Sequence, residues 1–173
     1  MMIVTHVFFV LKERVLQYNR VTDSSRNRDH TVLYNVLVVE DDRRMAQSLA
    51  AQIGVLGHTV AISYGPRMAL QQLNEVIPDV IFMDVHMPGI DGLEVLRFLR
   101  RDPMTMDVPV VIVSAEEQEE SKKAALEAGA NYYIVKPPTV EEIEKALETV
   151  VHLALPPESE EPEDEGQNTG APD

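Results

Sequence analysis

The chain of 173 residues contains no cysteine. That absence excludes disulfide bonds, thiolate nucleophiles and cysteine-ligated zinc or iron–sulfur sites. A cytosolic location fits a chain without cysteine. The sequence also has no G-x-x-x-x-G-K pattern, so a P-loop nucleotide site is excluded.

Basic residues are scarce, with 15 Lys and Arg against 29 Asp and Glu, a net charge of −14 and a pI of about 4.7. Direct nucleic-acid binding needs a basic face, so this composition argues against contact with DNA or RNA. Residues 156–173 carry seven acids, no base and no large apolar residue. We expect this tail to be disordered, with an acidic interaction tail as the alternative.

No apolar run at the start of the chain is long enough to cross a bilayer, which takes about 20 residues. Nine of the first eleven residues are apolar. No basic region precedes this run and no small-residue cleavage site follows it, so the pattern is not typical of a signal peptide. We expect residues 1–34 to be an extension, made of a short amphipathic helix and a linker. Docking of this helix to a membrane surface or a partner is the alternative. The helical stripe consists of Val4, Phe8, Leu11, Val15 and Tyr18.

Residues 35–155 alternate between short apolar runs and helical patterns, which predicts one α/β domain. Such alternation is typical of a three-layer, doubly wound parallel sheet with helices on both faces. The predicted strands are residues 36–40, 58–62, 79–84, 108–114 and 132–135. The predicted helical stripes are Met45, Leu49, Ile53 and Leu56; Met68, Leu70, Leu73 and Val76; Leu93, Leu96 and Leu99; a charged helix at 116–128; and Val140, Ile143, Leu147 and Val150.

Polar residues concentrate where the predicted strands end, which is where open α/β sheets bind ligands. These residues are Glu40, Asp41 and Asp42 after the first strand, Asp84 after the third, Ser114 at the end of the fourth and Lys136 after the fifth. Carboxylates that crowd together raise one another's pKa, and a divalent cation such as Mg²⁺ resolves that conflict. Acids, a metal, a lysine and a hydroxyl around one carboxylate are typical of phosphoryl transfer to an aspartate.

Four segments, VLVVEDD, MDVHMPGIDGLEVL, VIVSA and YYIVKPP, occur in this order between residues 36 and 138. With them, residues 35–153 resemble the response-regulator receiver domain of two-component signalling. The resemblance implies a flavodoxin-like (βα)5 sheet with strand order 2-1-3-4-5. It also implies a phosphorylated signalling protein, capable of slow self-phosphorylation from small donors and slow self-dephosphorylation, instead of an enzyme.

The resemblance gives each residue of the acidic site a role. Asp84 would accept a phosphoryl group from a sensor histidine kinase or a phosphotransfer protein. Asp41, Asp84 and the backbone carbonyl of His86 would bind Mg²⁺, with Glu40 acting mainly through a metal-bound water. Lys136 would pair with the phosphoryl group.

Two further residues would form the switch. Ser114 would turn toward the phosphoryl group, and Tyr133 would move into the space that the serine leaves. The Lys136–Pro137 peptide bond would be cis. A downstream effector protein would then read the surface formed by the fourth helix, the fifth strand and the fifth helix.

Three positions vary in this family. Glu40 stands where an aspartate is more usual, and it should keep a water-mediated role. His86 and Glu116 occupy places that tune the lifetime of the phosphorylated state, so we expect them to set the dephosphorylation rate. The alternative is that they are two solvated loop side chains.

Other functions stay open at this point. A phosphatase of the dehalogenase type would need an acid two residues after its nucleophile, where this chain has His86. A receiver-like scaffold would bind partners without phosphorylation. We expect a stand-alone receiver, because the sequence after residue 153 contains no pattern of a DNA-binding or catalytic domain. A homodimer through the effector-binding surface is a further alternative.

Overall fold

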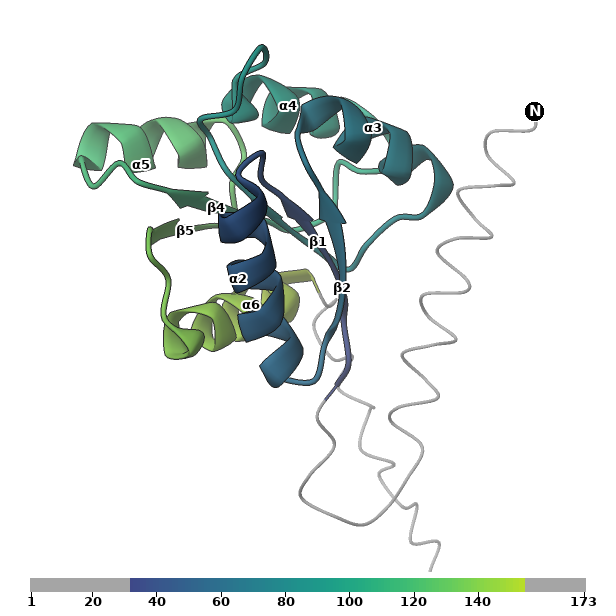
Figure 1. Cartoon of the computed structure of the whole chain (residues 1–173). Helices are drawn as coiled ribbons and strands as arrows, with labels where there is room; N and C mark the ends of the chain where they lie inside the picture. The colour runs from purple at the N-terminus through teal and green to yellow at the C-terminus, as the bar shows by residue number, and fades with distance from the viewer. Residues whose placement is uncertain (1–31, 155–173) are drawn as a thin grey trace, which may run out of the picture.

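The fold is a parallel sheet of five strands between two layers of helices (Figure 1). The computed structural model describes residues 32–154. The strands are β1 (Asn35–Val39), β2 (Thr59–Ser63), β3 (Val80–Met83), β4 (Val110–Ser114) and β5 (Tyr132–Val135). The helices are α2 (Arg43–Val55), α3 (Pro66–Glu75), α4 (Gly92–Leu99), α5 (Glu119–Glu127) and α6 (Val140–Ala154). The strands lie in the order β2-β1-β3-β4-β5, which confirms the predicted fold.

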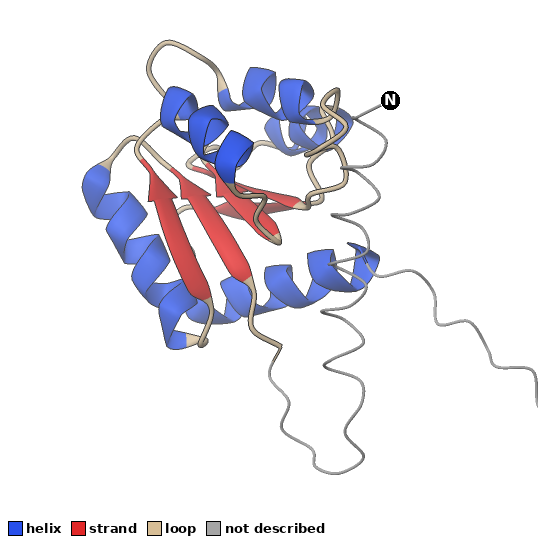
Figure 2. Cartoon of the chain, turned by 90° about the vertical axis from the view of Figure 1, so that its right-hand side faces the viewer, coloured by secondary structure: helices blue, strands red, loops and turns tan. Residues whose placement is uncertain are grey.

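The central strands are continuous apolar runs because helices cover both of their faces. Every residue of β3 and β4 is buried. Helices α2 and α6 pack on one face through Leu49, Ile53, Ile143 and Leu147. Helices α3, α4 and α5 cover the other face, and Figure 2 shows the sheet between the two layers. The edge strand β2, which has a neighbour on one side only, is partly exposed.

The ends of the helices follow local sequence signals. Gly57 after α2 and Gly129 after α5 have φ angles of 93° and 106°, a left-handed conformation that glycine adopts readily. The side chain of Asp91 accepts a hydrogen bond of 2.9 Å from the amide of Leu93 and so caps α4. The two glycines thus follow the ends of α2 and α5, and Asp91 marks the start of α4.

Part of the predicted pattern for α3 is wrong. Met68 and Val76 are exposed, at 43% and 69%, although their spacing predicts a buried stripe. Leu73 is buried as predicted, and Ala69, which the prediction omits, completes the buried face of α3. Val76 lies beyond the helix, in extended conformation, so helical spacing does not apply to it.

Several element boundaries differ from the prediction by one to three residues. Strand β4 begins at Val110 instead of residue 108, and β2 is displaced by one residue to Thr59–Ser63. Residues 116–118 belong to a loop before α5. Within residues 32–154, no helix is long and apolar enough to cross a membrane. The predicted amphipathic helix of the extension and the acidic tail at 156–173 lie outside the described residues.

Candidate functional site

The strand order brings the carboxyl ends of β1 and β3 together. The two strands are neighbours, and the amide of Asp84 donates a 2.9 Å hydrogen bond to the carbonyl of Val39. Carboxylate oxygens of Glu40, Asp41 and Asp84 therefore all lie within 4.8 Å of one another. Glu40 and Asp84 are buried, whereas Asp41 is exposed. The three acids form an acidic cup that opens to solvent at Asp41.

Lys136 closes the cup from the side of β5. Its Nζ lies 2.5 Å from Oε2 of Glu40 and 3.1 Å from Oδ2 of Asp84. The amide of Lys136 donates a 2.8 Å hydrogen bond to the carbonyl of Ser114, which aligns the end of β5 with that of β4. The Lys136–Pro137 bond is cis, as the family resemblance implies.

One lysine does not fully compensate the buried acids. Burial raises the pKa of Glu40, and the neighbouring charge of Asp84 raises it further, so the pKa stays above its usual value despite the bond to Lys136. Burial alone would lower the pKa of Lys136, but the hydrogen bond to Glu40 and the charges of both acids raise it above its usual value. The lysine therefore stays charged, while the cup still has an excess of negative charge.

The third acid after β1 has a different role from its neighbours. Oδ1 of Asp42 accepts hydrogen bonds of 2.8 Å and 3.0 Å from the amides of Arg44 and Met45. Asp42 is thus the N-cap of α2, and it does not belong to the group formed by Glu40 and the other two acids. The sequence could not separate these functions, because both need an acid after a strand.

The loop between β4 and α5 is bonded to the two predicted switch residues. The buried hydroxyl of Ser114 accepts a 3.2 Å hydrogen bond from the amide of Glu116. The hydroxyl of Tyr133 donates a 2.8 Å hydrogen bond to the carbonyl of the same residue. Ser114 and Tyr133 therefore both bind the backbone of Glu116, Ser114 at its amide and Tyr133 at its carbonyl.

The side chain of Glu116 reaches back toward the loop after β3. Its Oε1 lies 2.8 Å from Nε2 of His86. Hydrogen bonds from Ser121 and His86 lower the pKa of Glu116. A cavity of about 310 Å³ lies beside this pair, and Tyr133 and Leu93 contribute to its lining. The two residues predicted to act together are thus in contact with each other, joining the loop after β3 to the loop after β4.

Comparison with known proteins identifies the family of this domain. The family model described as "Response regulator receiver domain" matches residues 36–148, most of the chain. The chain belongs to the response regulator receiver family. The acidic cup, Lys136 and Ser114 lie at the strand ends of this receiver domain.

Curated relatives include the response regulator MprA of Mycolicibacterium vanbaalenii, which is 34% identical over 121 residues, covering 70% of this chain and 52% of the relative. The phosphate regulon transcriptional regulatory protein PhoB of Pseudomonas aeruginosa is 30% identical over 127 residues, 73% of this chain and 56% of the relative. The receiver chain thus spans about half the length of the curated relatives it matches. The stand-alone form expected from the sequence stays a prediction.

Two solved structures share the fold over nearly their whole length. A response regulator from Chloroflexus aurantiacus has a TM-score of 0.67 at 30% identity, covering 70% of this chain and 99% of that one. The chemotaxis protein CheY4 of Vibrio cholerae has a TM-score of 0.65 at 28% identity, covering 69% and 99%. Receiver domains of this family are signalling phosphoacceptors of two-component systems.

Sequence reasoning missed two side chains beside the site. The guanidinium carbon of Arg43 lies 4.5 Å from the centre of the Tyr64 ring. Arg43 begins α2 and Tyr64 follows β2, so they are 21 positions apart in the sequence. No local pattern signals this contact, because it depends on which strands are neighbours.

Proposed function

We propose that this receiver domain accepts a phosphoryl group on Asp84 from a sensor histidine kinase or a phosphotransfer protein. The observation that carries the proposal is the contact of Lys136 with both Glu40 and Asp84 inside the acidic cup. A carboxylate oxygen of Asp84 attacks the phosphorus of the donor. The bond from phosphorus to the leaving atom breaks, and its electron pair stays with the donor.

The donor set of the cup fits Mg²⁺, which prefers carboxylate oxygens and keeps several waters. Asp41, Asp84 and the backbone carbonyl of His86 would bind the ion, with Glu40 acting through a metal-bound water. The excess negative charge of the cup supports this assignment, because Lys136 contacts two of its three carboxylates and Asp41 has no ion pair among residues 32–154. When bound, Mg²⁺ supplies positive charge that offsets the negative charge on the transferred oxygens.

Lys136 would pair with the phosphoryl oxygens once the group is on Asp84. The hydroxyl of Ser114 would then turn from the amide of Glu116 toward a phosphoryl oxygen. Tyr133 is bonded to the carbonyl of Glu116, so a change at Ser114 is transmitted to the loop before α5. This is a population shift between two arrangements, and the phosphoryl group favours one of them. The surface of α5, β5 and α6 would present the change to an effector protein.

Intact-mass measurement tests the proposal. The purified protein is incubated with Mg²⁺ and acetyl phosphate, and we expect a mass gain of one phosphoryl group, mapped to the peptide that contains Asp84. Chelation of Mg²⁺ with EDTA should prevent the gain. Absence of the gain under all conditions would favour the scaffold that works without phosphorylation.

The contact between His86 and Glu116 leads to a separate prediction. Because Glu116 is bonded to His86 and Ser121, its carboxylate is not free to orient water. His86 lies two residues after Asp84, so we propose that this pair shields the phosphoryl group on Asp84 from water. Replacing both His86 and Glu116 with Ala should admit water and speed decay of the phosphoprotein roughly fivefold. The measurement is loss of the phosphoryl mass with time after removal of the donor. An unchanged or slower decay would contradict this role.

A phosphatase acting on small phosphoesters fits the site less well. That chemistry needs an acid or base free to protonate the leaving group and then activate water. The residue two positions after Asp84 is His86, and its Nε2 is bonded to Glu116. We therefore expect slow self-dephosphorylation instead of turnover of a small substrate.

A further inference from the structure

Two exposed arginines lie directly beside the acidic cup. Arg43 and Arg44 follow Asp41 and Asp42 in the chain and form the start of α2. The ring of Tyr64, half-buried at the end of β2, lies 4.5 Å from the guanidinium carbon of Arg43. A guanidinium over an aromatic face is held by the ring quadrupole, so Tyr64 fixes the direction of Arg43.

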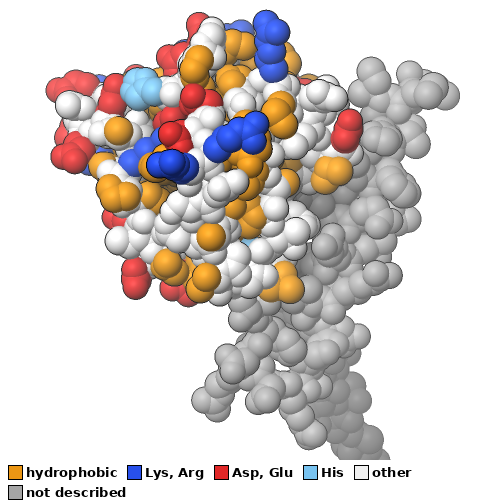
Figure 3. Space-filling model, viewed as in Figure 1, with side chains coloured by type: hydrophobic (Ala, Val, Ile, Leu, Met, Phe, Trp, Pro, Cys, Tyr) orange, Lys and Arg blue, Asp and Glu red, His pale blue; other side chains and the backbone are white. Residues whose placement is uncertain are grey.

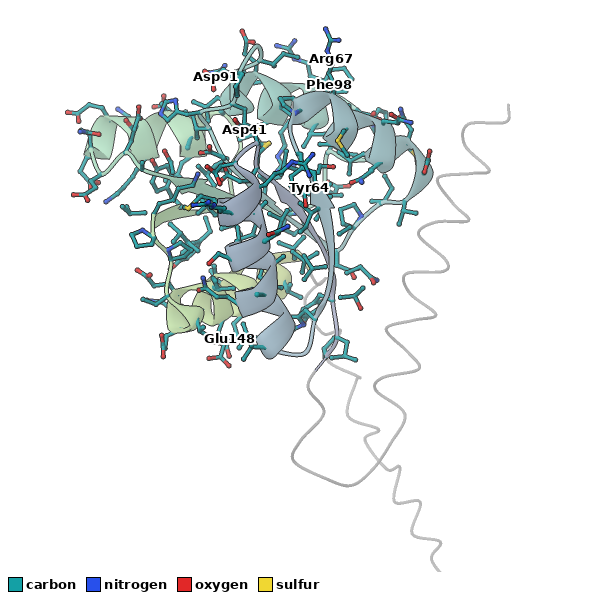
Figure 4. The ribbon with its side chains drawn as sticks, viewed as in Figure 1. Asp41, Tyr64, Arg67, Asp91, Phe98 and Glu148 are labelled. Atoms are coloured by element: carbon teal, nitrogen blue, oxygen red, sulfur yellow. The ribbon has the colours of Figure 1, made fainter. Side chains whose placement is uncertain are left out.

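Neither arginine has an acidic partner among residues 32–154. Three of the four lysines in this range do, because Lys122, Lys123 and Lys136 each lie within 4.0 Å of a carboxylate oxygen, whereas Lys145 does not. Figure 3 shows Lys or Arg side chains beside acidic ones where α2 begins. Figure 4 shows Asp41 and Tyr64 at this same part of the molecule, with Glu148 at its opposite end.

The backbone holds both arginines next to the cup. Oδ1 of Asp42, the residue after Asp41, accepts hydrogen bonds from the amides of Arg44 and Met45. This cap fixes the first turn of α2, which carries Arg43 and Arg44, directly after the exposed acid of the cup.

This placement matters because the phosphoryl donor is an anion. The chain has a net charge of −14, and three carboxylates surround the point of attack. Such a field opposes the approach of a doubly negative phosphoryl group. Exposed cations within a Debye length of about 8 Å can reverse the local potential and raise the rate of encounter. Guanidinium groups also match phosphoryl oxygens in geometry.

We propose that Arg43 and Arg44 form a cationic rim that draws the phosphoryl group of the donor toward Asp84, with Arg43 positioned by Tyr64. The inference rests on the proposed function, in which Asp84 is the acceptor. It extends that function by assigning Arg43 and Arg44 as the residues that position the phosphoryl group of the donor. The rim recognises the anionic phosphoryl group, which both an acyl phosphate and a phosphohistidine carry.

The test is the second-order rate constant for phosphorylation of the full chain with Mg²⁺. The double variant Arg43→Gln, Arg44→Gln should react roughly fivefold more slowly with acetyl phosphate at low ionic strength, and the difference should shrink in about 0.5 M salt. The variant Arg43→Lys, Arg44→Lys keeps both charges and should restore most of the rate. Thermal unfolding of each variant shows whether the fold is kept.

A matched control separates the rim from net charge. The variant Arg97→Gln, Arg101→Gln makes the same change of two charges in the last turn of α4 and just after it. This end of α4 leads toward the start of β4, at the edge of the sheet opposite the cup. We expect this variant to react at the wild-type rate.

The experiment is carried out with two phosphoryl donors of different chemistry. Phosphoramidate carries the P–N bond of a phosphohistidine, and acetyl phosphate carries an acyl phosphate. A slower reaction of the rim variant with both donors supports recognition of the phosphoryl group itself, and a loss with one donor alone assigns the rim to that source. Equal rates for the rim variant and wild type, or an equal fall in the control, would overturn the proposal. A wild-type protein that no donor phosphorylates would overturn the proposed function and the rim with it.

Discussion

Replacing Asp84 with Asn is expected to abolish phosphorylation of this protein completely. An amide lacks the anionic oxygen that attacks phosphorus, and the cup loses one of its three negative charges. The substitution is isosteric, and the amide oxygen can still accept the hydrogen bond from Lys136. The fold should therefore be kept while the chemistry is lost. Intact-mass measurement with acetyl phosphate and Mg²⁺ checks the result.

The stability of this variant gives a second readout. The charge of Asp84 contributes to the raised pKa of Glu40, so removing it relieves repulsion between two buried acids. We expect a melting temperature equal to that of the wild type or higher. A strongly lowered melting temperature would mean that loss of the phosphoryl mass reports unfolding and not loss of the nucleophile.

Asp91→Asn is the matched control. Asp91 is an exposed acid that caps α4, and asparagine caps helices about equally well. This variant should gain the phosphoryl group at the wild-type rate. If Asp84→Asn still acquires the group, another residue is the acceptor, and Asp41 is the next candidate because it is the exposed acid of the cup.

The sequence predicts the fold and the site because both depend on the spacing of apolar residues and on the order of the strands and polar residues along the chain. Apolar runs at β1, β3 and β4 are read directly, and parallel strands place their ends at one edge of the sheet. The acidic and cationic residues that follow these runs must therefore converge there. The structure confirms the convergence of Glu40, Asp84 and Lys136. Their chemical roles remain predictions that the variants described here test.

The features that the sequence could not give depend on exact neighbours in space. Met68 has the spacing of a buried residue, but the orientation of α3 on the sheet exposes it and buries Ala69. Asp42 is an acid like those beside it, and only the amides that it faces make it a cap. The contact of Arg43 with Tyr64 requires that β1 and β2 pair, so no local signal precedes it.

Gly92 is another such feature, and replacing it with Ala is expected to destabilise the domain by about 3 kcal/mol. A Cβ at this position would lie 2.2 Å from the backbone oxygen of Asp84 and 2.8 Å from Cα of Val85. Both neighbours are backbone atoms, so no side-chain rotation relieves the clash. The amide of Gly92 also donates a 2.8 Å hydrogen bond to the carbonyl of Val85. The start of α4 is thus packed directly against the backbone of the phosphoacceptor.

Urea unfolding measures this effect, and Gly54→Ala is the matched control. Gly54 is an exposed residue of α2, and a Cβ there would meet no atom within 4 Å. Alanine in that helix should stabilise the protein by about 0.5 to 1 kcal/mol, because it restricts the unfolded chain and favours the helix. The Gly92→Ala variant should also be phosphorylated more slowly, since relief of the clash must displace Asp84 or α4. Equal unfolding midpoints for Gly92→Ala and the wild type would contradict this prediction. They would show that α4 can move away from Asp84 without loss of stability. The close packing would then have no part in positioning the carboxylate.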